Sequence, residues 1–277
     1  MALDDVSLRI GQGEFVAIVG PSGGGKSTLL NVLGLLDFPD GGEYLIDGAA
    51  MPSQEGATTA RIRSTAFAFV FQAFHLLLSR PVRHSVELGL MYRGVKARAE
   101  PATAALERVG LAGRAEEIAS HLSGGQQQRA AIARAIASNA RIVLADEPTG
   151  NLDSENARLI IAELQALNKA GATVIVVTHS ADVAAAADRQ LRIRDGRLVS
   201  DTVQEHPDGV ASVRATEEPR DRAETPMHSA AIPARTPADT RLQTAAGDQD
   251  WTHPTRWKKR PSLLKRDIFR DAWQSAL

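Results

Sequence analysis

Residues 14–28 read Glu-Phe-Val-Ala-Ile-Val-Gly-Pro-Ser-Gly-Gly-Gly-Lys-Ser-Thr, an apolar run followed at once by a glycine-rich loop. The run 14–19 has the composition of a buried strand, and from Gly20 the sequence fits the pattern G-x-x-x-x-G-K-[ST]. Glycines at these positions let backbone N–H groups turn inward around phosphate oxygens, at the positive end of a helix that begins near Lys26. The stretch therefore predicts an α/β nucleotide-binding fold of the P-loop NTPase type.

Two side chains of this loop have separate expected tasks. We expect Lys26 to reach the β- and γ-phosphates of a nucleotide, and Ser27 to bind Mg²⁺. The predicted phosphate-binding loop as a whole comprises Gly20, Pro21, Ser22, Gly23, Gly24, Gly25, Lys26, Ser27 and Thr28.

A pair of carboxylates follows another strand-like run. Residues 144–153 read Leu-Ala-Asp-Glu-Pro-Thr-Gly-Asn-Leu-Asp, directly after the apolar residues 142 and 143. Ligands of open α/β sheets bind at the carboxyl ends of the strands, so Asp146 and Glu147 are placed to serve a metal ion and a water together. A polar turn at a strand end is the alternative interpretation. The phosphate-binding loop upstream favours the interpretation that Asp146 and Glu147 serve a metal ion and a water.

A third motif, Leu-Ser-Gly-Gly-Gln-Gln-Gln-Arg at 122–129, precedes a helical run over 129–137. By itself it predicts a helix with a serine N-cap. Leu-Ser-Gly-Gly-Gln resembles the signature of ATP-binding cassette (ABC) ATPases, and the order of the three motifs is that of the same family. The resemblance covers residues 3–199. Within the family, 144–153 and Tyr-Arg-Gly-Val at 92–95 are similar to the branch of lipoprotein-release ATPases, macrolide exporters, peptide-antibiotic exporters and the cell-division ATPase.

The resemblance implies a role for each motif residue. Gln72 is similar to the glutamine that senses Mg²⁺ and contacts the transmembrane partner. Asp146 would hold Mg²⁺, and Glu147 would polarise the attacking water. Asp153 resembles the aspartate that communicates across the dimer. His179, after the predicted strand 173–178, resembles the switch histidine that contacts the γ-phosphate.

The same resemblance implies a head-to-tail homodimer. Ser123, Gly125 and Gln126 would act in trans, on ATP held by the other subunit. The implied protein is an ATP-binding and hydrolysing subunit that uses ATP and Mg²⁺ and energises a separate permease for lipoprotein, lipid, macrolide or peptide export. It would lie at the cytoplasmic face of the membrane as a peripheral subunit.

Several other functions stay open on the sequence. A regulatory ABC ATPase would signal to a permease-like partner without transport. A truncated cassette would bind nucleotide without hydrolysing it. A cassette that acts on DNA or ribosomes usually carries two cassettes or long insertions, which are absent here, so we expect no nucleic-acid partner.

The chemistry of phosphoryl transfer explains why such residues are needed. The transition state is loose, so catalysis is mainly positioning and charge stabilisation by Lys26, Mg²⁺ and backbone donors. A general base then has only to orient the water. Glu147 and His179 both fit that task, and the residues alone do not rank them. The family resemblance favours Glu147.

The composition limits the remaining possibilities. The formal net charge is −1, which gives no global attraction to nucleic acid or to an anionic membrane. The chain has no cysteine, which excludes disulfides and thiolate metal sites and is compatible with a reducing cytosol. The first residues lack a leader pattern and no stretch approaches 18 apolar residues. We therefore expect another chain to span any membrane at which this protein works.

Strand-like and helical patterns alternate along the chain in the way of a parallel sheet with crossover helices. We predict an ABC-type nucleotide-binding domain over residues 1–200, with a helical subdomain at about 73–139 and a closing hairpin whose turn lies at 195–196. The predicted strands are 14–19, 66–71, 141–146 and 173–178, and the predicted helices 26–36, 102–109, 125–138, 154–169 and 180–187.

From about residue 200 the composition changes. Residues 201–250 are rich in Ala, Thr, Pro and charged residues, which predicts a disordered linker. Residues 251–277 form a basic segment whose apolar residues share one helical face. Packing of that helix on its own domain is one interpretation. Our hypothesis is a contact with the membrane surface.

Two features depart from the family pattern. No aromatic residue precedes Phe15, although cassettes normally stack one on adenine upstream of this point. We therefore expect the adenine platform and first strand to be truncated. The stretch 73–81 is less regular than expected next to a permease contact.

Overall fold

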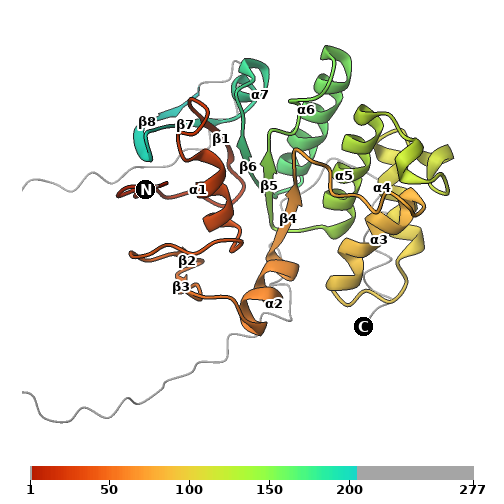
Figure 1. The fold of residues 1–277 in the computed structure, drawn as a ribbon, viewed down its shortest axis with the longest axis horizontal. Helices are drawn as coiled ribbons and strands as arrows, with labels where there is room; N and C mark the ends of the chain where they lie inside the picture. Colours follow the sequence, from red (N-terminus) through yellow and green to blue (C-terminus); the bar gives the residue numbers. More distant parts are fainter. Residues whose placement is uncertain (1, 205–277) are drawn as a thin grey trace, which may run out of the picture. The chain divides into compact units, whose positions relative to one another are not determined.

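The computed structural model describes residues 2–204, which form a sheet with helices on both faces (Figure 1). The predicted linker from 205 onward and the predicted basic segment 251–277 lie outside these residues. The elements up to the middle of the chain are β1 (Phe15–Val19), α1 (Lys26–Leu33), β2 (Leu45–Ile46), β3 (Ala49–Ala50), α2 (Ala57–Ala66), β4 (Phe67–Val70), α3 (Val82–Tyr92) and α4 (Ala99–Arg108). They are followed by η1 (Ala112–Arg114), η2 (Ala119–His121), α5 (Gly124–Ser138), β5 (Ile142–Asp146), α6 (Ser154–Lys169), β6 (Thr173–Val177), α7 (Ala181–Ala185), β7 (Arg189–Arg194) and β8 (Arg197–Val203).

The main sheet has the strand order β4-β5-β6-β1-β7-β8. The first five strands are parallel and β8 is antiparallel to β7. Since the chain crosses from β1 to β4 and from β6 back to β7, strands far apart in sequence become neighbours. The parallel arrangement brings the carboxyl ends of β4, β5, β6 and β1 to one edge of the sheet.

Both faces of the sheet are buried, which explains why its strands are continuous apolar runs. On β1, Val16 and Ile18 pack with α1 and α2, whereas Phe15 and Ala17 pack with the helices of the opposite face. Figure 1 shows α1 on one side of the sheet and α5 and α6 on the other. Successive side chains of one strand thus join two separate hydrophobic clusters.

Helices α3, α4 and α5 pack on one another beside β4. Several buried residues of α5 are small, which lets neighbouring elements approach the helix closely: Ala130, Ala131 and Ala133 are completely buried. The helix begins at a capping box made by Ser123 and Gln126 and ends at Asn139, which is in the left-handed conformation with a φ of 46°. Helix α5 therefore has well-defined ends.

The irregular stretch after β4 is held by α5. Phe74 and His75 both have left-handed backbone conformations, with φ of 59° and 49°. Arg134 of α5 donates hydrogen bonds to their carbonyl oxygens, 3.1 Å from Phe74 and 2.7 Å from His75. A further bond, 2.9 Å from the Leu77 N–H to the hydroxyl oxygen of Ser85, joins the stretch to α3. The unusual loop conformation is thus fixed by side chains of neighbouring helices.

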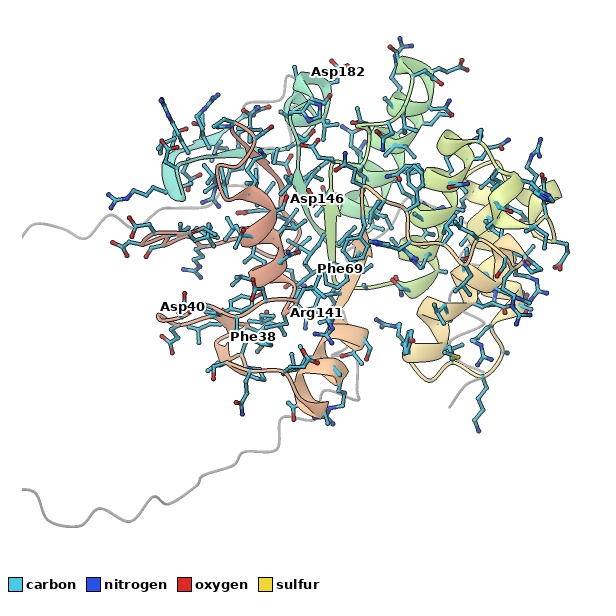
Figure 2. All side chains as sticks on the ribbon, in the orientation of Figure 1. Phe38, Asp40, Phe69, Arg141, Asp146 and Asp182 are labelled. Carbon is cyan, nitrogen blue, oxygen red and sulfur yellow. The ribbon has the colours of Figure 1, made fainter. Side chains whose placement is uncertain are left out.

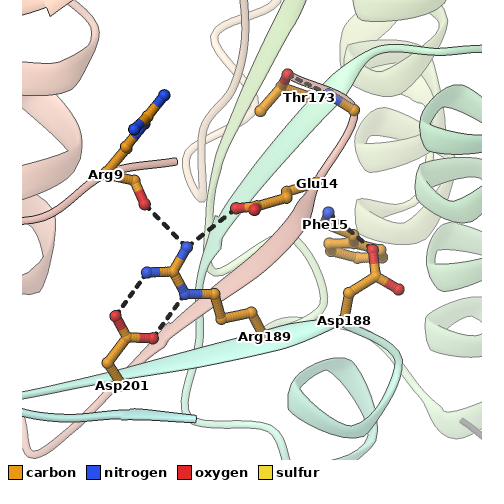
Figure 3. Close-up of polar contacts among 8 residues, drawn as sticks. Arg9, Glu14, Phe15, Thr173, Asp188, Arg189 and Asp201 are labelled. Atoms are coloured by element: carbon orange, nitrogen blue, oxygen red, sulfur yellow. Dashed lines mark hydrogen bonds and ion pairs between the residues drawn. The ribbon is translucent and has the colours of Figure 1, made fainter. Parts of the chain in front are cut away.

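Arg189 joins the β7–β8 hairpin to the N-terminal segment (Figure 3). Its guanidinium binds both carboxylate oxygens of Asp201, at 2.6 and 2.5 Å, and also contacts Glu14 at 3.1 Å and the carbonyl oxygen of Arg9 at 2.8 Å. The composition places the end of the domain at residue 200, but β8 continues to Val203. Asp201 is therefore part of the sheet, and the predicted start of the linker at 201 is wrong.

Residues 2–204 contain no helix with the length and apolarity that crossing a bilayer requires.

Candidate nucleotide-binding and catalytic site

The predicted site residues follow four adjacent strands of the sheet. The glycine-rich loop follows β1, Asp146 ends β5 (Figure 2), His179 comes two residues after β6, and Gln72 comes two residues after β4. Because these strands are parallel neighbours, their carboxyl ends gather at one edge. The fold thus brings together residues that are more than 150 positions apart.

The glycine-rich loop needs its glycines for steric reasons. Gly20 and Gly25 have φ of 151° and 100°, a region that side chains disfavour. A Cβ on Gly20 would lie 2.0 Å from the carbonyl oxygen of Ile193, and one on Gly25 would lie 2.4 Å from that of Ala2. At Gly20 and Gly25 the neighbouring backbone segments leave no room for a side chain.

Lys26 is buried at 8% exposure, and its ammonium contacts its own loop. Its Nζ donates to the carbonyl oxygens of Gly20 at 3.0 Å and Pro21 at 2.9 Å. The positive charge therefore lies inside the curve of the loop. When a phosphate binds there, the Lys26 ammonium would exchange these carbonyl oxygens for the anionic oxygens of the phosphate.

Ser27 and Asp146 meet although 119 residues separate them. The Ser27 hydroxyl donates to Oδ1 of Asp146 at 3.3 Å. Burial raises the pKa of Asp146, the neighbouring charge of Glu147 raises it further, and the Ser27 hydrogen bond and Lys26 lower it. A cation next to these oxygens would favour the ionised carboxylate. Within residues 2–204 no cluster of three or more His, Cys, Asp or Glu side chains is arranged around a metal position.

Glu147 and His179, the two candidate bases, are bonded to each other. Oε1 of Glu147 lies 2.9 Å from Nδ1 of His179, and the His179 N–H donates to Oε2 at 3.3 Å. The Glu147 side chain is 14% exposed and that of His179 is 69% exposed. Glu147 itself has a left-handed φ of 46°, and its N–H donates to the carbonyl oxygen of Val177 at 2.9 Å. The glutamate is thus fixed in place, while the histidine faces outward.

A tight turn after Glu147 carries the chain away from the sheet. The Gly150 N–H donates to the Glu147 carbonyl oxygen at 3.1 Å, with Pro148 and Thr149 between them. Gln72 lies beside this turn, since a Cβ on Gly150 would be 3.9 Å from its Nε2. Residues 147–150, which we call the catalytic turn, therefore lie next to two predicted site residues, Gln72 and His179.

Gln128 is not among the predicted site residues, yet its Nε2 donates to the Pro148 carbonyl oxygen at 2.7 Å. This side chain is only 1% exposed. It is spaced four and seven residues from the buried Ile132 and Ala135 of α5. A polar residue on the apolar stripe of a helix is the signal that could have found it.

The signature residues lie at the beginning of α5. The Ser123 hydroxyl accepts from the Gln126 N–H, and the Gln126 side chain accepts from the Ser123 N–H. A Cβ on Gly125 would lie 3.3 Å from the side chain of Asn156, which in turn donates to Asp153 at 2.7 Å. Among the hydrogen bonds and ion pairs of residues 2–204, none joins the signature to the phosphate-binding loop of the same chain.

Asp153 is the N-cap of α6. Its carboxylate accepts the Asn156 N–H at 2.9 Å, and these hydrogen bonds from Asn156 lower the pKa of Asp153. Asp153 therefore stabilises the start of α6, next to the signature helix α5.

Comparisons with known proteins agree with this geometry. Residues 3–150 match the protein family described as ABC transporter. The chain is 49% identical over 210 residues to the macrolide export ATP-binding/permease protein MacB of Burkholderia pseudomallei, covering 75% of this chain and 32% of that protein. It is 47% identical over 205 residues to the probable syringafactin export ATP-binding/permease protein SyfD of Pseudomonas syringae pv. syringae, covering 73% and 31%. The chain spans about a third of the length of these curated relatives.

A solved structure is similar over most of its own length. The dimeric, post-hydrolysis state of the ATP-binding cassette MJ0796 bound to ADP and Pi matches with a TM-score of 0.69 and 40% identity, covering 74% of this chain and 91% of that one.

Proposed function

This chain belongs to the ABC transporter family, and we propose that its cassette binds and hydrolyses ATP in order to energise a transmembrane permease. The observation that carries the proposal is the convergence of three groups at one sheet edge. These are the Lys26 ammonium inside the glycine-rich loop, the Ser27–Asp146 contact, and the Glu147–His179 pair. Together they supply a phosphate site, a cation site and a water-orienting base.

The triphosphate would bind in the loop around Lys26. The backbone N–H groups of the loop and the start of α1 favour anionic oxygens, and Lys26 would turn from the Gly20 and Pro21 carbonyls to the phosphates. The lysine also neutralises charge that accumulates in the transition state.

Mg²⁺ fits the residues next to the loop. Ser27 and Asp146 present a hydroxyl and one carboxylate within 3.3 Å of each other. Mg²⁺ prefers such hard oxygens and usually takes one or two carboxylates together with phosphate oxygens and waters. We propose that Ser27, Asp146 and Gln72 hold the ion, which would neutralise charge on the β- and γ-phosphates when bound.

Glu147 is the better placed of the two candidate bases. Its side chain is more buried than that of His179, and both the ring nitrogen and the backbone N–H of His179 hold it. We propose that Glu147 orients and activates the water. The contact through Nδ1 leaves Nε2 of His179 for the γ-phosphate, so the histidine can report the presence of ATP to the glutamate.

The signature residues support a dimeric mechanism. Ser123, Gly125 and Gln126 make no polar contact with the phosphate-binding loop of their own chain in the part that the structure describes. We propose that they complete the ATP site of a second copy of this chain, as the head-to-tail arrangement requires. The likeness to a dimeric cassette supports this assembly.

The curated relatives combine the words ATP-binding and permease in their names, and export is the stated purpose of both. We propose that this chain serves a permease of the same export type, at the cytoplasmic face of the membrane. The non-hydrolysing alternative predicts a different outcome of the experiment below.

The test compares the 277-residue chain with Glu147→Gln. We expect the unchanged chain to bind ATP and to release phosphate only with Mg²⁺. We expect Glu147→Gln to bind ATP normally and to lose about 100-fold or more of its turnover, as removal of a general base does. In gel filtration with ATP, this variant should elute as a dimer, because hydrolysis no longer dissociates the ATP-bound dimer.

Glu163→Gln is the matched control, because Glu163 pairs with Arg108 at 3.1 Å on α6, in an ion pair outside the site. Its turnover should be unchanged. Full turnover by Glu147→Gln would contradict the assignment of the base. Binding without any hydrolysis by the unchanged chain would favour the non-hydrolysing module.

A further inference from the structure

Gln128 is a buried amide that connects the signature helix to the catalytic turn. It lies on α5, five residues after Ser123, and donates from Nε2 to the Pro148 carbonyl oxygen at 2.7 Å. Pro148 directly follows Glu147, so this bond is made one residue from the proposed base. Only 1% of the glutamine is exposed, which means that water does not compete for the bond.

The amide is poorly explained by stability alone. Its Oε1 is buried and has no hydrogen-bond partner among the described residues. A buried polar atom without a partner destabilises the folded state, and an apolar side chain of the same length would remove that cost. The feature that distinguishes Gln128 from such a side chain is the donor that holds the catalytic turn.

A second contact joins the same two segments. Gly125, in the first turn of α5, packs against the Asn156 side chain, and Asn156 hydrogen-bonds to Asp153. The chain from Glu147 to Asp153 is therefore attached to α5 near both of its ends. A displacement of the start of α5 must be transmitted to this whole segment.

Helical geometry makes the transmission direct. Five residues of α-helix span about 7.5 Å, and the capping box fixes the first turn, so Ser123 and Gln128 move as one body. In the proposed function, which this inference rests on, Ser123 contacts ATP held by the partner subunit while Glu147 acts on ATP in its own subunit. When the dimer closes around the partner's ATP, the resulting movement of Ser123 would thus be passed along α5 to Glu147, the base that acts on the ATP of its own subunit.

We propose that Gln128 is a positioning residue that couples the two ATP sites of the dimer. It sets the position of the catalytic turn, and hence of Glu147, according to where the signature helix lies. It makes no contact with nucleotide itself.

The test uses Gln128→Met, which keeps the length and the packing but removes the donor. We expect ATP affinity within about twofold of the unchanged chain, a similar thermal midpoint, a fall in kcat of about tenfold or more, and a Hill coefficient for ATP close to 1. Misplacing a catalytic group by about 1 Å can cost about 10²-fold, so a shift of the turn is enough for this loss. Gln128→Asn, one methylene shorter, should lose less turnover and provides a second folded variant.

Gln190→Met is the matched control. Gln190 of β7 is partly buried and donates from its amide to the Ala184 carbonyl oxygen at 3.1 Å, so the variant loses the same kind of hydrogen bond without touching the catalytic turn. Its kcat should be unchanged. If Gln128→Met and Gln190→Met behave alike, or if Gln128→Met loses turnover only in proportion to its folded fraction, Gln128 is merely structural and the proposal is overturned.

A double-mutant cycle with Ser123→Ala tests the coupling itself. Because both residues are proposed to act through one displacement of α5, the double variant should have the kcat of the more impaired single variant. Multiplicative losses would overturn the coupling. Absence of hydrolysis in the unchanged chain would instead contradict the proposed function, so the two failures are distinguishable.

Discussion

Replacing Arg134 by Met tests how the stretch after β4 is held. The guanidinium donates to the carbonyl oxygens of His75 and Phe74, and both of these residues have left-handed conformations. Burial lowers the pKa of Arg134, so the charge is partly removed from water. Methionine keeps most of the aliphatic packing and removes both hydrogen bonds.

The magnitude follows from these contacts. A hydrogen bond from a charged group contributes about 1.5–3 kcal/mol, so two bonds contribute about 3–6 kcal/mol. Release of the loop recovers about 1–2 kcal/mol for each left-handed residue that relaxes. The expected net loss in the free energy of unfolding is about 2 kcal/mol, which corresponds to a fall of about 4–8 °C in Tm for a domain of this size.

Chemical denaturation and amide hydrogen exchange check this prediction. Exchange should accelerate for residues 73–81 and remain slow in the strands of the sheet. Arg114→Met is the control, because Arg114 forms an exposed pair with Glu117 whose loss should change stability by less than about 0.5 kcal/mol. A loss below about 0.5 kcal/mol for Arg134→Met, or unchanged exchange over 73–81, would refute the reasoning.

Three further changes have defined outcomes. Gly20→Ala should abolish ATP binding in a fluorescence titration and cost about 3 kcal/mol or more, because its Cβ would meet the Ile193 carbonyl oxygen; normal affinity would contradict this. Arg189 lowers the pKa of Asp201, so this carboxylate contributes stability above its unfolded pKa that is lost as the pH falls through the lower folded value. Asp201→Asn should accordingly flatten the curve of stability against pH below about pH 4. Asn139→Ala should cost about 1 kcal/mol in urea denaturation because alanine tolerates the left-handed C-cap less well, whereas Asn139→Gly should be close to neutral.

The sequence predicted β1, β4, β5 and β6 to within one residue at each end. The runs at 14–19, 141–146 and 173–178 became β1, β5 and β6 because a strand buried on both faces must be apolar throughout. Helix α2 was not predicted, since Ile62 is its single large apolar residue and gives no helical period. It is fixed by tertiary contacts instead, such as the 2.7 Å bond from Arg63 to the Leu35 carbonyl oxygen.

The candidate site was predictable where a local motif encodes the backbone. The glycine-rich loop has the predicted place, and the structure brings Ser27 next to Asp146, although their roles remain predictions until tested. The position of Gln128 against Pro148 was not predictable, because it depends on how α5 packs on a turn 20 residues away. Local pattern therefore predicts the parts, and packing decides which parts touch.

The contact of Lys26 with the carbonyl oxygens of Gly20 and Pro21 has a consequence for the end of a catalytic cycle. The two carbonyl oxygens compete with a bound phosphate for the Lys26 ammonium. The free energy of these two hydrogen bonds is therefore subtracted from the affinity for any nucleotide. When the product leaves, the Lys26 ammonium can again donate to these two carbonyl oxygens, so it does not remain buried without a hydrogen-bond partner. We expect the loop to keep its shape after release and to be ready for the next nucleotide without refolding.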